Sequence, residues 1–143
     1  MRALFMLSLF LLSPAVASAQ DEKVDLEIKV VSLSTKEGKF EPELKALIAG
    51  LPLSYRSGQT IDGHIKPAVA KGESVRFQLK ETKEWVLVEV KGISASGFDF
   101  KVQFGEKGTG LRAKATKRGA AVIVGPVAKP APEVELFVVI TPR

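Results

Sequence analysis

The feature of this sequence that most limits its fold is a two-residue alternation of apolar and polar side chains, repeated in short segments along the chain. From Val24 to Val30 the even positions are apolar, while Asp25, Glu27 and Lys29 between them are charged. Residues 98–104 alternate in the same way. Because successive side chains of a strand point to opposite faces of a sheet, the pattern predicts strands with one buried face and one wet face.

Other segments show related patterns, separated by turn signals at intervals of about ten residues. We predict further strands at 60–66, 75–80, 85–93, 111–115, 120–124 and 134–141. In the weakest of these, Ile61 and Ile65 are expected on one face. Residues 85–88 are apolar on both faces, which predicts a central strand or a strand covered by a helix. Gly125-Pro126 is expected to open a loop that runs to Pro132.

One short helix is predicted near the N-terminal end, at 42–49. Pro42 suits the first turn of a helix, and Glu43 lies near its positive end. Leu44 and Leu47 follow at helical spacing, and Gly50 closes the segment. We therefore predict a mainly β (α+β) domain with this helix packed on the sheet. Its six or seven antiparallel strands would form a β-sandwich or a partly open barrel.

The first twenty residues have the three parts of a secretory signal peptide. Arg2 supplies a basic start, residues 3–12 are apolar except for Ser8, and Ala17-Ser18-Ala19 matches a small-residue cleavage site. The apolar run falls well short of the roughly 20 residues that span a bilayer. We predict cleavage after Ala19, which leaves one β-rich domain at 20–143 without a transmembrane segment. Its destination would be the periplasm, the outer membrane or the medium.

The chain contains no cysteine, which excludes disulfides, thiolate metal sites and a lipid-modified cysteine. The exported domain must therefore be stabilised by its core alone. Lys and Arg number 21 against 16 Asp and Glu. This balance is typical of a solvated protein surface of mixed charge, and it would also allow binding to an anionic surface of the cell envelope. Nucleic acid is not expected as a partner in this compartment.

The residues needed for catalysis are scarce. His64 is the single histidine, so the sequence lacks the residues for a two-histidine zinc site, and no residue pattern around His64 indicates a Ser-His-Asp triad. The carboxylate pairs Asp25/Glu27 and Glu133/Glu135 read as solvated strand faces. The glycine-rich run at 105–110 precedes an alternating strand rather than a helix, which predicts a β-turn and not a phosphate-binding loop. We predict no catalytic residue, metal or cofactor.

Two groups of residues are candidates for binding. Arg112 and Lys114 would share one strand face, with Lys117 and Arg118 at its end. Such a stripe could bind lipopolysaccharide phosphates, acidic peptidoglycan groups or an acidic protein surface, or it could keep an edge strand from pairing with other chains. The second group is Tyr55-Arg56, where the ring could equally pack on the core and the hydroxyl cap the backbone.

About the last 25 residues resemble the end of the bacterial secretin domain. The first similar segment is Arg118-Gly119 followed by an apolar strand that ends at Gly125. After a loop, the second begins at Glu135-Leu136 and continues through an apolar run to Thr141-Pro142-Arg143. Pro126 stands where secretins usually have a second glycine. Secretins are multimeric outer-membrane pores of secretion systems and type IV pili. A complete secretin also needs membrane-crossing hairpins and ring domains, so the resemblance implies an accessory role.

The mature region also resembles small exported bacterial proteins of uncharacterised function. The shared features are the alternating first strand, a Leu-rich short helix, the connection Leu51-Pro52-x-x-Tyr55-Arg56 and a final hairpin interrupted by Gly125-Pro126. This resemblance implies export and a β-rich fold. It carries no activity.

Two functional hypotheses follow. The first is a non-catalytic envelope protein that binds another protein, as an accessory or structural subunit of a secretion or pilus system. The alternative is a periplasmic module that binds an anionic glycan or lipid headgroup on the stripe from Arg112 to Arg118.

Overall fold

The computed structural model describes residues 22–51, 55–105 and 108–143. The predicted signal peptide lies outside these ranges, as do parts of the Leu51–Arg56 connection and of the glycine-rich turn. The elements in chain order are β1 (Lys23–Ser34), α2 (Pro42–Ile48), β2 (Ser57–Ala70), β3 (Ser74–Gln78), β4 (Trp85–Ser94), β5 (Gly97–Phe104), β6 (Thr109–Ala115), β7 (Val122–Ala131) and β8 (Val134–Pro142).

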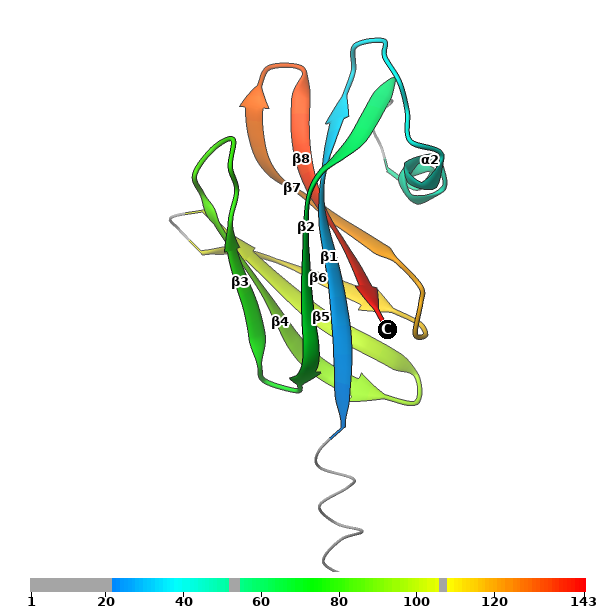
Figure 1. Ribbon diagram of the computed structural model, residues 1–143, viewed down its shortest axis with the longest axis vertical. Coiled ribbons are helices and arrows are strands. Elements are labelled where there is room, and N and C mark those ends of the chain that lie inside the picture. Colours follow the sequence, from blue (N-terminus) through cyan, green and yellow to red (C-terminus); the bar gives the residue numbers. More distant parts are fainter. Residues whose placement is uncertain (1–21, 52–54, 106–107) are drawn as a thin grey trace, which may run out of the picture.

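Two four-stranded antiparallel sheets form a sandwich, which confirms the predicted fold class (Figure 1). Sheet A has the order β2-β1-β8-β7, and sheet B has the order β3-β4-β5-β6. The chain passes from one sheet to the other between β2 and β3 and between β6 and β7. Sheet B is therefore a simple meander of neighbouring hairpins, whereas sheet A pairs the first strands with the last.

The main core lies between the sheets and is built by the alternation seen in the sequence. Its fully buried members include Leu26 and Ile28 from β1, Ile140 from β8, Val88 from β4 and Phe100 from β5. Burial of each such side chain contributes about 1.5–3 kcal/mol. The inner faces of the two sheets thus pack against each other.

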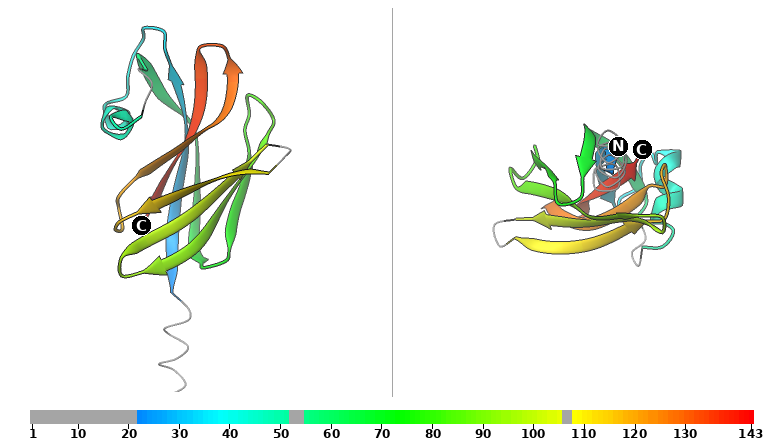
Figure 2. Two further views of the ribbon diagram at one scale, coloured as in Figure 1. Left: turned by 180° about the vertical axis from the view of Figure 1, so that it is seen from behind. Right: turned by 90° about the horizontal axis from the view of Figure 1, so that it is seen from below.

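α2 lies against the outer face of sheet A (Figure 2), and a second apolar cluster lies beneath it. Its buried residues are Val31, Leu33, Leu44, Tyr55, Phe137 and Val139. This cluster explains why β1 has adjacent buried residues at Val30 and Val31 and why β8 is buried along most of its length. The predicted packing of the helix on the sheet is confirmed, and it buries part of sheet A on both faces.

The outer face of sheet B is polar, and no helix of the described residues covers it. Alternation along β5 directs Asp99, Lys101 and Gln103 outward, while Phe98 and Phe100 face the core. β4 is a central strand, as predicted, but the helix covers the other sheet. Trp85 is therefore 48% exposed instead of buried.

Residues 22–51, 55–105 and 108–143 contain eight strands, one more than the upper expected number, because the weakest candidate is a strand and is longer than predicted. The predicted loop at 125–132 is wrong, since β7 continues to Ala131 with Val127 and Ala128 buried. β7 is an edge strand with register shifts around its Gly125–Pro126 cis peptide, and edges and bulges tolerate proline.

No helix within residues 22–51, 55–105 and 108–143 has the length and hydropathy to cross a membrane.

Candidate functional site

The structure places Arg112 and Lys114 side by side on the outer face of sheet B, as the alternation predicted. Both are exposed on β6, the edge strand of that sheet. Arg112 is paired in register with Lys101, and Lys114 with Asp99. These two candidates therefore belong to a face on which other charged side chains also lie.

Arg118 has a different role from its neighbours in sequence. Its guanidinium donates hydrogen bonds to the backbone carbonyls of Arg143 at 2.9 Å and Lys23 at 3.3 Å. It also lies over the ring of Phe98, 5.3 Å from the centroid. Arg118 thus ties the connection after β6 to the start of β1 and the end of β8. Lys117 lies beside it and lines, together with Arg118 and Phe98, a cavity of about 240 Å³.

Tyr55 lies in the apolar cluster beneath α2, apart from that stripe, and Arg56 follows it in the chain. The Tyr55 hydroxyl donates a 2.9 Å hydrogen bond to Glu135 Oε1, and its ring meets the Phe137 ring edge-on at 5.7 Å. The expected packing on the core is present, but the hydroxyl binds a carboxylate and not the backbone. Arg56 is exposed and forms an ion pair with Glu37. The structure therefore separates the predicted candidates into three places.

Tyr55 gives a direct test of this cluster because it is the only tyrosine of the chain. Burial raises the pKa of its hydroxyl to about 12, and the hydrogen bond to Glu135 adds to the shift. A folded-state pKa above the usual value of about 10 means that the stabilisation is complete below pH ~10 and is lost as the pH rises toward 12.

Absorbance titration should therefore show phenolate formation near pH 12 in the folded protein, and at lower pH in Glu135→Gln. Ionisation of Tyr55 near pH 10 in the folded wild type would contradict the buried hydrogen bond.

The sequence analysis missed a pair on the same face of sheet B. Arg76 on β3 lies with its guanidinium 4.2 Å from the centroid of the Trp85 ring on β4. A cation held over an indole ring in this way is a favourable contact, worth about 0.5–1 kcal/mol at exposed sites. A signal was present, because Trp85 shares its strand parity with Leu87 and Glu89 and not with the core residues Val86 and Val88.

These residues define what we call the aromatic-basic face of sheet B: Arg76, Trp85, Lys101, Arg112 and Lys114. All five are exposed or half-buried on the outer side. Two acidic side chains interrupt them, Glu89 opposite Lys101 and Asp99 opposite Lys114. Lys91 also points outward and lies 3.3 Å from Glu89. Basic groups therefore outnumber acidic ones on a face that is charged in both signs.

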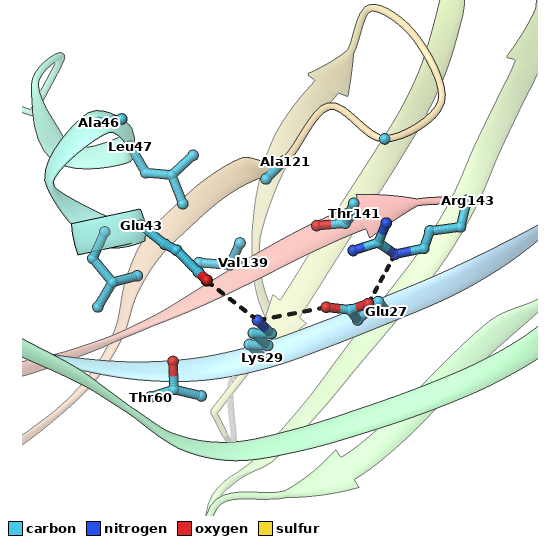
Figure 3. A pocket seen from close by; sticks show the side chains of 12 residues that line it. Glu27, Lys29, Glu43, Ala46, Leu47, Thr60, Ala121, Val139, Thr141 and Arg143 are labelled. Carbon is cyan, nitrogen blue, oxygen red and sulfur yellow. Dashed lines mark hydrogen bonds and ion pairs between the residues drawn. The ribbon is translucent and has the colours of Figure 1, made fainter. Parts of the chain in front are cut away.

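A cavity of about 240 Å³ lies between α2 and the outer face of sheet A, and we call it the α2 cleft (Figure 3). Its charged side chains form a chain of alternating sign. Arg143 Nε is 2.8 Å from Glu27 Oε2, and Lys29 Nζ lies 3.6 Å from Glu27 Oε1 and 3.7 Å from Glu43 Oε2. The hydrogen bond from Arg143 lowers the pKa of Glu27 despite partial burial, and the charge of Lys29 acts in the same direction.

His64 lies on the inward side of β2, the edge strand of sheet A. It faces β3, the edge strand of sheet B. Its ring stacks on Phe77 of β3 at 4.4 Å, and its Nε2 is 3.2 Å from Asp62 Oδ2. Burial raises the pKa of Asp62, but the N–H of Gly63, His64 and Lys80 together lower it. His64 lines neither of the cavities described above. Inward polar side chains such as these protect an edge strand from pairing with other chains.

Comparison with family models, curated proteins and solved structures found no match in any of the three. Kinship with secretins or with the small exported bacterial proteins therefore stays a prediction.

Proposed function

We propose that the protein is an exported, non-catalytic protein of the cell envelope that binds an acidic surface of a partner protein through the aromatic-basic face. The observation that carries the proposal is the Arg76–Trp85 pair, exposed among basic side chains on the outer face of sheet B. Trp and Arg are enriched among the residues that dominate binding energy at protein interfaces. The excess of basic groups favours an acidic partner.

The position of the helix supports this choice of face. α2 covers part of the outer face of sheet A, whereas no helix of the described residues covers the outer face of sheet B. The segment that resembles secretins lies in β7 and β8, where Leu136 to Ile140 are buried. The resemblance is therefore compatible with an accessory role in a secretion or pilus system, but its residues do not form the proposed face.

The charge pattern favours a protein over an anionic glycan or lipid headgroup. The four basic residues of the predicted stripe do not converge, since Arg118 binds backbone carbonyls. Glu89 and Asp99 lie among the basic residues and would repel closely spaced phosphates or uronates. Protein surfaces, which present both signs of charge, match such a face better.

The proposal is tested by capture from envelope extracts with the immobilised mature chain, residues 20–143. We compare the wild type with Arg76→Glu/Arg112→Glu, which reverses two charges on the aromatic-basic face. The matched control is Lys39→Glu/Lys45→Glu, because both lysines are exposed near α2 and lie off this face. Circular dichroism checks that all three are folded.

We expect the wild type and the control to retain the same partner, and the face variant to retain at least about tenfold less. Binding should weaken as salt is raised, because exposed charges are screened. Equal capture by the face variant would overturn the proposal. Capture that survives protease treatment of the extract and is reproduced with purified envelope glycan or lipid would favour the alternative.

A further inference from the structure

We propose that the α2 cleft is a second binding site, for a zwitterion of amino-acid size with an aliphatic side chain. The cleft lies on the outer face of sheet A, and the aromatic-basic face lies on the outer face of sheet B. This inference does not depend on the function proposed above, and none of its residues belongs to that face.

The size of the cleft limits the ligand. Its volume of about 240 Å³ is below the roughly 300–1,000 Å³ typical of pockets for drug-sized ligands. Its apolar lining includes Leu44 and Leu47 of α2 and Val139 of β8. A small ligand with an aliphatic group would bury that group against these side chains.

The charges of the cleft limit the ligand further. Glu27 is bound by Arg143 through Nε, whereas Lys29 lies at 3.6 and 3.7 Å from its two carboxylate neighbours. Both of these distances exceed the 2.7–3.2 Å of an N–H···O hydrogen bond. The Lys29 ammonium, between Glu43 and Glu27 in Figure 3, can therefore turn toward a ligand oxygen without breaking a short bond.

Neither a simple anion nor a simple cation suits this arrangement. An anion near Lys29 would also lie near the carboxylates of Glu27 and Glu43, and a cation near those carboxylates would lie near Lys29 and Arg143. A zwitterion satisfies both signs. Its carboxylate would accept hydrogen bonds from Lys29, and its ammonium would meet Glu43, whose side chain is 80% exposed and able to rotate.

The test is an NMR titration of the ¹⁵N-labelled chain with three probes. L-leucine carries both charges, N-acetyl-L-leucine lacks the ammonium, and L-leucinamide lacks the carboxylate. We expect L-leucine to shift the amide signals of Glu27, Lys29 and Val139, and each analogue to bind at least about tenfold more weakly, because each leaves one charged partner unmatched.

Variants separate the site from non-specific binding. Lys29→Met should abolish the L-leucine shifts, and Glu43→Gln, at a side chain that is 80% exposed, should weaken L-leucine binding by about tenfold. Lys45→Met, on the same helix but outside the cleft, should leave them unchanged. Equal binding of the three probes, no shift with L-leucine, or unchanged binding by Lys29→Met and Glu43→Gln would overturn the proposal. None of these results bears on capture by the aromatic-basic face.

Discussion

Replacing Gly97 by alanine is expected to lower the free energy of unfolding by about 3 kcal/mol or more, which is among the largest effects available to a single methyl group. Gly97 opens β5 after the tight turn from β4 and has a φ of +133°. An added Cβ would lie 2.3 Å from the carbonyl oxygen of Ala115 and 3.2 Å from Thr116 Cα. Both contacts are with the backbone at the end of β6, so no side-chain rotation relieves them.

Urea denaturation followed by circular dichroism measures the effect. The matched control is Gly63→Ala, because Gly63 also lies in a strand but, apart from its chain neighbours, no described residue has an atom within 4 Å of an added Cβ there. The control should change stability by no more than about 0.5 kcal/mol. If Gly97→Ala were as stable as Gly63→Ala, the close approach of β5 to the end of β6 would be wrong.

Phe137→Ala should lower the free energy of unfolding by about 3–5 kcal/mol, the usual range for removing a buried aromatic ring. Phe137 is 2% exposed on the outer face of sheet A, where it packs with Tyr55 and the residues beneath α2. On a sheet with one solvated face, the same substitution would cost little. The size of the loss therefore reports whether α2 and its flanking segments cover that face.

Ile65→Ala is the control for this second prediction. Ile65 lies on β2 of the same sheet, and it is 78% exposed. Its replacement should stay within about 0.5 kcal/mol of the wild type. A loss for Phe137→Ala no larger than that for Ile65→Ala would contradict the presence of a second buried cluster.

The strands that sequence reasoning located best are those with one buried and one solvated face. β5 alternates without interruption, and its bounds follow directly from Phe98 to Phe104. β2 was located poorly because its pairing with β1, which its own sequence does not show, determines its faces. A register shift opposite Val30 and Val31 places Ile61 against the main core while Ile65 is left in solvent, so the two do not share an environment.

The error at 125–132 has a related cause. Gly125 and Pro126 signal a break in a regular ladder, and the register of β7 does shift there. The chain nevertheless continues as an edge strand, because only one side of an edge strand needs backbone partners. The local composition indicated that the strand is irregular here. It did not indicate that β8 pairs with this segment and keeps it in the sheet.

The candidate site was only partly accessible from the sequence, for the same reason. Alternation along one strand was enough to place Arg112 and Lys114 together. The contact between Arg76 and Trp85 depends on the register of β3 against β4, in which Arg76 pairs with Leu87 and lies diagonally from the ring. The role of Arg118 depends on carbonyls of Lys23 and Arg143, which are remote in sequence. No local pattern encodes such contacts.

The proposed binding face can be tested most directly through the fluorescence of Trp85, the only tryptophan of the chain. Because the ring is half-exposed on that face, a soluble quencher such as acrylamide should reach it in the free protein. When the captured partner is added at saturation, we expect the emission to shift to shorter wavelength and the quenching constant to fall severalfold. Unchanged emission and unchanged quenching in the saturated complex would show that the partner binds elsewhere and would contradict the proposed face.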